Sequence, residues 1–156
     1  ILDNRTTAMT GHQEHAGTGK GLRGDPTPSV DIEAIVRAIG ITDVRVVDAF
    51  RLPDIEKAIS GALESECASV VLVRGACVLQ TRGPNDPAVV DATICDGCSG
   101  CIRTGCPAIG FRDGKAVIDP ALCVGSRCAV CVDTCPKQAI SIPSAKVSEP
   151  VRGRTP

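Results

Sequence analysis

The sequence predicts an α/β protein: half of a doubly wound sheet over residues 1–80, followed by a small α+β domain over residues 89–142. Two observations predict this division. Within residues 31–73, apolar segments alternate between the period of a helix and the continuous pattern of a buried strand. Eight of the ten cysteines lie within Cys95–Cys135, so the second part has a different chemistry from the first.

Local signals predict each element of the sheet. Asp31 can cap a helix that ends at Gly40, and Pro53 fits the first turn of a second helix. Strands are expected at residues 44–47 and at 70–73, where a continuous apolar run is typical of a parallel strand covered on both faces. The apolar stripes of the two helices are Ile32, Ile35, Val36 and Ile39, then Ile55, Ala58, Ile59, Ala62 and Leu63.

The chain begins with Ile1-Leu2-Asp3, which reads as the end of a buried strand, and has no initiator methionine. A strand needs partners, so we expect the chain to be the C-terminal piece of a longer protein. Residues 4–28 are rich in Gly and Thr, and a loop that follows a strand is where an open α/β sheet binds its ligand. Composition alone favours an ordinary surface loop, with His12 and His15 as surface histidines.

The remaining segments are expected to be structural or unstructured. Residues 81–88 are a predicted linker because Gly and Pro punctuate them, and the polar residues 143–156 are a predicted disordered tail. Cys67 and Cys77 border the last strand of the sheet. We expect both to be structural, since an unpaired cysteine behaves as a small hydrophobe.

The other cysteines form two runs, each ending in Cys-Pro. Their spacings are C-x2-C-x2-C-x4-C-P and C-x4-C-x2-C-x3-C-P. The first is one residue longer, and the second two residues longer, than the C-x2-C-x2-C-x3-C-P run of bacterial two-cluster ferredoxins. In that run the fourth cysteine binds the other cluster. We therefore predict two [4Fe–4S] clusters, the first held by Cys95, Cys98, Cys101 and Cys135 and the second by Cys106, Cys123, Cys128 and Cys131.

Zinc and disulfides are the alternatives. Zinc also binds C-x2-C pairs, but a zinc site rarely uses two linked triplets that end in Cys-Pro. A disulfide framework suits a small secreted domain, whereas these cysteines are confined to one third of the chain. An internal repeat favours the clusters: residues 90–95 are echoed by 118–123, and residues 109–118 between them read as a hairpin that turns at Asp-Gly.

Composition excludes some partners. The chain has 17 basic and 18 acidic residues, so neither nucleic acid nor an anionic membrane is implied as a partner. No apolar run approaches the roughly 20 residues of a membrane span. Reduced cysteines that bind iron imply the cytoplasm.

The opening residues resemble a known family. Residues 1–13, ILDNRTTAMTGHQ, are similar to the second half of the thiamine-diphosphate motif of the 2-oxoacid:ferredoxin oxidoreductases. Within that family, the order of parts up to about residue 142 resembles the C-terminal part of the α subunit of the indolepyruvate-oxidising enzymes. The resemblance implies a partial thiamine-diphosphate-binding domain over residues 1–80 and a two-[4Fe–4S] ferredoxin-like domain over residues 89–142.

The resemblance also implies site residues. Asn4 would give its side-chain oxygen and Thr6 its backbone carbonyl to the Mg²⁺ that holds the diphosphate, while Gly11, His12 and Gln13 match positions that line the cofactor pocket. The family's metal-binding Asp and its cofactor-activating Glu lie outside this sequence. The chain alone is therefore not expected to be active.

The implied reaction is the oxidative decarboxylation of an arylpyruvate, such as indolepyruvate, to acyl-CoA and CO₂, with the two clusters passing electrons singly to ferredoxin. The implied partners are ferredoxin, coenzyme A, the 2-oxo acid, the rest of the α subunit and a smaller β subunit. The alternative is a non-catalytic, two-cluster electron-transfer subunit of another redox complex.

Overall fold

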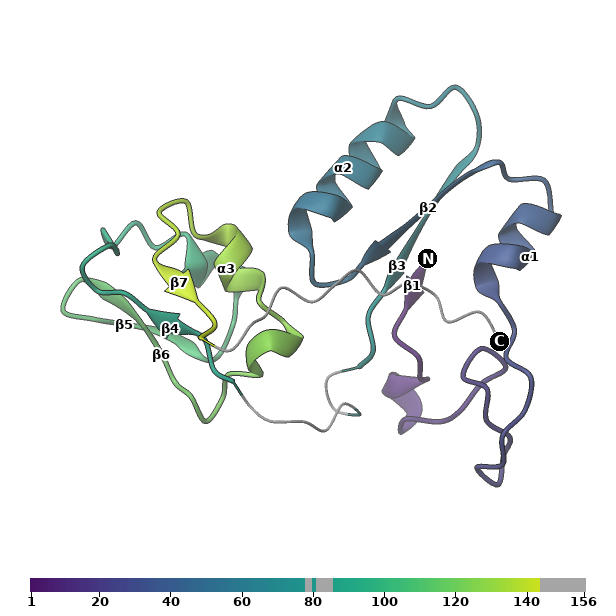
Figure 1. Ribbon diagram of the computed structural model, residues 1–156, viewed down its shortest axis with the longest axis horizontal. Coiled ribbons are helices and arrows are strands. Elements are labelled where there is room, and N and C mark those ends of the chain that lie inside the picture. Colours follow the sequence, from purple (N-terminus) through teal and green to yellow (C-terminus); the bar gives the residue numbers. More distant parts are fainter. Residues whose placement is uncertain (78–79, 81–85, 144–156) are drawn as a thin grey trace. The chain divides into compact units, whose positions relative to one another are not determined.

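The computed structural model describes residues 1–77, 80 and 86–143 (Figure 1). The chain divides into two compact units, residues 1–83 and 84–156. The predicted tail, apart from residue 143, and residues 81–85 of the predicted linker lie outside the described residues.

The first unit contains a parallel sheet of three strands in the order β1-β3-β2. The strands are β1 (Leu2–Asp3), β2 (Asp43–Asp48) and β3 (Ser69–Arg74). The central strand β3 pairs with both neighbours in parallel. The predicted α/β unit with a parallel sheet is therefore confirmed.

Two helices connect these strands. Helix α1 (Ile32–Ala38) begins where the Asp31 carboxylate accepts the N–H groups of the first turn, and α2 (Leu52–Leu63) has a proline in its first turn, both as the sequence predicts. The chain moves two places along the sheet through α1 and one place back through α2. Right-handed crossovers in opposite directions place the helices on opposite faces, and Figure 1 shows the strands between them.

The helices cover the sheet less completely than the apolar pattern suggests. In the predicted run 70–73 only Leu72 is fully buried, and the other residues are half-buried. At the end of the two predicted stripes, Ile39 is 73% exposed and Leu63 is 82% exposed. Cys67 is also exposed, so the prediction that it packs as a small hydrophobe is wrong: it lies in the turn after α2, where no layer covers it.

The second unit is built from two small antiparallel pairs. Strand β4 (Val89–Val90) pairs with β7 (Ile140–Ser141). Strands β5 (Ile109–Arg112) and β6 (Lys115–Ile118) form the predicted hairpin, which turns with positive φ at Asp113 and Gly114. Three short helical turns complete the unit: η2 (Cys101–Thr104), η3 (Gly125–Arg127) and α3 (Val130–Thr134).

Cysteines make up much of the second unit's core. The buried residues of its core cluster are Ala88, Cys101, Ala116 and Ile140, and four further cysteines pack against them partly buried. Ala88 was expected in the linker but is only 5% exposed, because it is part of this core. Because the core cluster has few large buried side chains, we expect a group bound by the cysteines to add to the stability of the unit.

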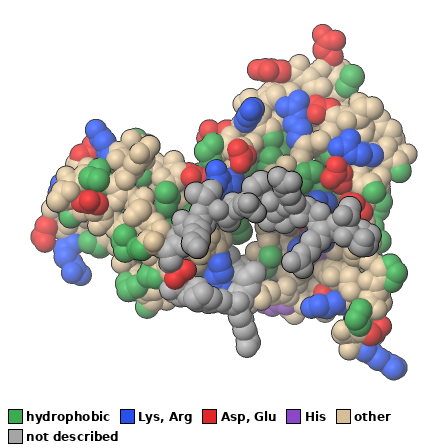
Figure 2. All heavy atoms as spheres, viewed as in Figure 1, with side chains coloured by type: hydrophobic (Ala, Val, Ile, Leu, Met, Phe, Trp, Pro, Cys, Tyr) green, Lys and Arg blue, Asp and Glu red, His purple; other side chains and the backbone are tan. Residues whose placement is uncertain are grey.

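The surface matches the near-neutral composition. Figure 2 shows basic and acidic side chains interspersed over the visible face. In the part of the chain that the structure describes, no helix has the length and apolarity needed to cross a membrane.

A polar network fastens α2 to the sheet. The Arg45 side chain donates from Nη2 to the carbonyl oxygen of Gly61 at 2.8 Å, near the end of α2. The Asp43 carboxylate accepts from Arg45 Nε at 2.9 Å and from Ser69 Oγ at 2.8 Å. These hydrogen bonds, first that from Arg45 and then that from Ser69, lower the pKa of Asp43 to about 2.

We expect this network to make stability pH-dependent. Because the folded pKa of Asp43 lies below its unfolded value, the ionised carboxylate stabilises the fold above about pH 4, and this contribution is lost as the pH falls towards 2. Asp43→Asn should lower the thermal midpoint at neutral pH and flatten its decline in acid, as measured by calorimetry. Asp54→Asn, at an exposed residue, is the control and should keep the wild-type profile. Identical acid profiles for wild type and Asp43→Asn would contradict the assignment.

Candidate cluster and cofactor sites

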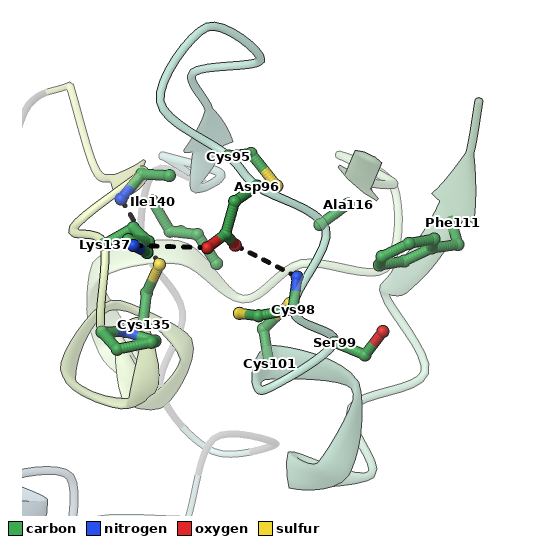
Figure 3. A pocket seen from close by; sticks show the side chains of 12 residues that line it. Cys95, Asp96, Cys98, Ser99, Cys101, Phe111, Ala116, Cys135, Lys137 and Ile140 are labelled. Carbon is green, nitrogen blue, oxygen red and sulfur yellow. Dashed lines mark hydrogen bonds and ion pairs between the residues drawn. The ribbon is translucent and has the colours of Figure 1, made fainter. Parts of the chain in front are cut away.

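The first predicted set of cysteines surrounds one cavity. Cys95, Cys98 and Cys101 come from the segment that follows β4, whereas Cys135 follows α3. Figure 3 shows the two segments facing each other across this space. The rest of the lining is largely apolar, so the sulfurs are its main chemically active groups.

Backbone N–H groups surround these sulfurs. Hydrogen bonds from the N–H groups of Ala116 and Gly97 lower the pKa of the Cys95 thiol. The Lys115 ammonium donates to the carbonyl oxygen of Cys95, and its charge acts in the same direction. The N–H of Ala139 donates to the sulfur of Cys135 at 3.3 Å. These contacts favour the thiolate of Cys95, the form of cysteine that binds metal.

The second predicted set is also assembled. Burial, and then the charges of Cys123, Cys128 and Cys106, raise the pKa of Cys131 to about 11. The four cysteines are thus close enough to influence one another. The Cys123 sulfur accepts two backbone N–H groups, from Ala88 and Gly125, each at 3.4 Å.

The two halves repeat the same turn. The N–H of Cys95 donates to the carbonyl oxygen of Asp91 at 2.9 Å, and that of Cys123 donates to Asp119 at 3.0 Å. In both turns the aspartate side chain accepts the N–H of the residue two positions on, at 2.8 Å. The sequence did not lead us to expect a role for these aspartates, although each lies four residues before the first cysteine of its run. The hydrogen bonds explain the sequence repeat.

Backbone pairing also crosses between the halves. Asp91 N–H donates to the carbonyl oxygen of Ala139, which follows the last cysteine of the second run, at 2.8 Å. Asp119 N–H donates to Ala108, which follows the last cysteine of the first run, also at 2.8 Å. Lys137 Nζ adds an ion pair to Asp96 at 3.4 Å (Figure 3). The chain thus brings the start of each run beside the end of the other.

A glycine lies two residues after the first cysteine of each run. Gly97 and Gly125 have φ angles of +77° and +62°. A Cβ at Gly97 would overlap the carbonyl oxygen of Gly114, and one at Gly125 would overlap the backbone of Asp86. Both positions therefore require glycine for conformation and for space.

The donor sets fit the chemistry of a cubane cluster, for which four thiolates are needed around one body. Among the described residues, no three His, Cys, Asp or Glu side chains are grouped to hold one metal ion. In a cubane each thiolate binds a different iron. Burial raises the pKa of Cys101 and of the partly buried Cys131, so a bound cationic centre would help these thiols to ionise.

The interval that is lengthened in each run, by one residue in the first and by two in the second, contains a short helical turn. The interval between Cys101 and Cys106 contains η2, and that between Cys123 and Cys128 contains η3. Both turns are of the 3-10 type. The additional residues are thus part of regular backbone.

The residues matched to the thiamine-diphosphate motif form a closed loop after β1. The Asn4 Oδ1 atom accepts the N–H of Thr6 at 3.2 Å, and Thr6 Oγ1 donates to the carbonyl oxygen of Gln13 at 3.4 Å. Asn4, Thr6 and Gln13 are therefore brought together. Gly11 and His12, both with positive φ, lie at the exposed end of the loop.

A buried ion-pair group supports this loop. Asp3, whose side chain is only 3% exposed, lies 3.5 Å from both Arg5 and Arg74. Arg5 also donates to the carbonyl oxygen of Gly17 at 2.9 Å. Asn4 and Thr6 supply oxygen atoms, the ligand type that Mg²⁺ takes, but too few to complete an octahedral site. The chain therefore fits part of a Mg²⁺–diphosphate site.

Gly97→Ala should remove iron from the anaerobically purified protein. The new Cβ would collide with the hairpin and displace Cys95 and Cys98, so at least the iron of the first set should be lost. Gly114→Ala is the matched control, since its φ of +75° imposes the same backbone strain of about 1–2 kcal/mol with no heavy atom near the new Cβ. Iron analysis measures both variants. Full iron in Gly97→Ala, or an equal loss in the control, would contradict the role given to this contact.

Comparisons with known proteins agree with the first unit's topology. Residues 1–73 match the family model of the thiamine pyrophosphate enzyme C-terminal TPP binding domain. Proteins named indolepyruvate oxidoreductase subunit IorA are 42% identical over 142 residues in Methanothermobacter thermautotrophicus and 40% identical over 146 residues in Archaeoglobus fulgidus. Each alignment covers 90% of this chain and 23% of the relative.

The chain thus spans about a quarter of the length of these relatives. No solved structure matches it significantly. The resemblance that the sequence indicates is confirmed: over nine tenths of its length the chain is similar to proteins named IorA subunit of indolepyruvate oxidoreductase, and residues 1–73 match the thiamine pyrophosphate enzyme C-terminal domain.

Proposed function

We propose that this chain is part of a thiamine-diphosphate-dependent 2-oxoacid:ferredoxin oxidoreductase that acts on arylpyruvates such as indolepyruvate. The observation that carries the proposal is the match of residues 1–73 to a thiamine pyrophosphate enzyme domain in the same chain as a cavity lined by four cysteines. The charges of three further cysteines act on Cys131, which supports a second set. The names of the relatives support the substrate class.

The reaction explains why both parts are needed. Oxidative decarboxylation of the 2-oxo acid with coenzyme A releases CO₂, acyl-CoA, two protons and two electrons. Bound thiamine diphosphate supplies the decarboxylation chemistry, and bound [4Fe–4S] clusters supply one-electron transfer. Ferredoxin accepts electrons one at a time, so a two-electron oxidation needs intermediate stations.

The chain's own residues have separate roles in this proposal. Asn4 and Thr6 would present oxygen atoms to the Mg²⁺ of the cofactor, and Gln13 closes the loop that carries them. Asp3 and Arg74 would hold that loop at the edge of the sheet. In the second unit, the two cysteine sets would hold the clusters, and the backbone N–H groups around Cys95 and Cys123 would stabilise their negative charge.

The remaining parts of the site would come from outside this chain. We expect the upstream part of the same subunit to supply a metal-binding carboxylate and the group that activates the cofactor. A smaller partner subunit, coenzyme A and ferredoxin complete the proposed system. The second candidate is a non-catalytic electron-transfer subunit, which the two cysteine sets alone would also suit.

Metal analysis tests the clusters. The anaerobically purified chain should contain about eight iron and about eight acid-labile sulfide per molecule, because two [4Fe–4S] clusters carry that number. It should be brown, and its reduced form should give the electron paramagnetic resonance signal of [4Fe–4S] clusters. A colourless chain that contains zinc and no sulfide would refute the cluster assignment.

Asn4→Ala in the complete protein tests the cofactor role. It should abolish retention of thiamine diphosphate and 2-oxoacid-dependent dye reduction while leaving the iron content unchanged. Asn4→Asp is the control, since a carboxylate can still accept the N–H of Thr6 and bind Mg²⁺. Dye reduction by the wild type that does not depend on added thiamine diphosphate would favour the electron-transfer subunit instead.

A further inference from the structure

An open hollow lies beside the first cysteine set. It has a volume of about 520 Å³. Its wall comes from η2 and the residues before it on one side and from the end of α3 on the other: Cys98, Gly100, Arg103, Thr104, Thr134 and Pro136. None of the roles proposed above uses this hollow.

The hollow and the cysteine cavity share a wall. Cys98 and Pro136 line both, and Cys98 is exposed whereas Cys101 of the same set is buried. A molecule seated in the hollow would therefore contact a predicted cluster ligand directly. The hollow is therefore one surface from which the first set can be approached.

The positive charge of Arg103 favours an anionic occupant for the hollow. Among the described residues that line it, Arg103 alone is charged, and its side chain is exposed at the last turn of η2. The two threonine hydroxyls donate inward, Thr104 to the carbonyl oxygen of Cys101 at 2.7 Å and Thr134 to that of Val130 at 2.8 Å. Arg103 is thus the group that can meet an anionic partner.

The nearest pair of opposite charges does not change this balance. Lys137 and Asp96 lie in the lining of the cysteine cavity and pair with each other at 3.4 Å (Figure 3). The Asp96 carboxylate also accepts the N–H of Cys98 at 3.1 Å. Asp96 is thus already paired, and in the part of the chain that the structure describes no ion pair is found for Arg103, the charged residue of the hollow.

We propose that this hollow is the docking surface for an acidic one-electron carrier protein, with Arg103 contacting a carboxylate of the carrier beside Cys98. The inference rests on the proposed function, since it takes the first cysteine set to hold a cluster. It goes further by naming the surface, the contact residue and the set from which electrons leave. Complementary charge at such a surface acts mainly on association and loses strength in salt.

Charge reversal at Arg103 tests the proposal in the complete, cluster-loaded protein. A purified acidic two-cluster ferredoxin serves as the carrier, and its binding is measured by calorimetry at low and at physiological salt. Arg103→Glu should weaken binding about tenfold at low salt, with a smaller loss at physiological salt. Arg103→Lys should keep part of the affinity because it keeps the charge.

Arg112→Glu is the matched control. Arg112 is exposed on β5 in the same unit and does not line the hollow, so its reversal makes the same change in net charge. We expect it to bind the carrier nearly as the wild type does. Equal weakening by both variants, or no weakening by Arg103→Glu, would overturn the proposal.

Two further measurements distinguish a failure of the docking proposal from a failure of the proposed function. The cluster signals in electron paramagnetic resonance and the 2-oxoacid-dependent reduction of a small dye should be unchanged in Arg103→Glu. Loss of subunit assembly in this variant would show that the hollow is filled by the enzyme's own complex and would overturn the proposal. Absence of dye reduction in the wild type would refute the proposed function, while the binding comparison would still decide the docking surface.

Discussion

Backbone N–H groups directed at two sulfur atoms organise the second unit. Gly97 donates to Cys95 and Gly125 donates to Cys123, each from a left-handed turn that only glycine fits. The unit has few large apolar side chains to pack, so these polar contacts fix where the sulfurs lie. Bound metal would complete the core and would make folding and metal binding one event.

In the first unit, a buried ion-pair group at the edge of the sheet has the corresponding role. Its short parallel strands end in charged residues, and the buried Asp3 is matched by arginines from the adjoining loop and from β3. A buried carboxylate is tolerated when it is paired. This pairing fixes the first residues of the loop that carries Asn4 and Thr6, so the loop begins from a rigid position at the edge of the sheet.

Features that depend on neighbouring residues could be predicted from the sequence, whereas features that depend on residues far apart in the chain could not. The Asp31 cap, the proline of α2 and the Asp-Gly hairpin depend on neighbours in the chain, and all are present. The order β1-β3-β2 and the exposure of Cys67 depend on what lies across the sheet or beyond a turn. The Asp3–Arg74 pair joins residues far apart in sequence, so no spacing announces it. The fixed spacing of the cysteines predicts which four line the cavity of the first set, whereas the hollow beside Cys98 depends on how η2 and α3 pack.

The helical turns η2 and η3 have a consequence for chain length. The turn η2 begins at the third cysteine of the first run, in an interval one residue longer than in ferredoxins. The turn η3 begins at the left-handed Gly125, in an interval two residues longer. Lengthening at these two points leaves the Asp91 and Asp119 turns intact. Such a scaffold can therefore accept longer intervals at particular places while the turn before each cysteine run keeps its hydrogen bonds. A rigid search template for cysteine intervals would overlook proteins built in this way.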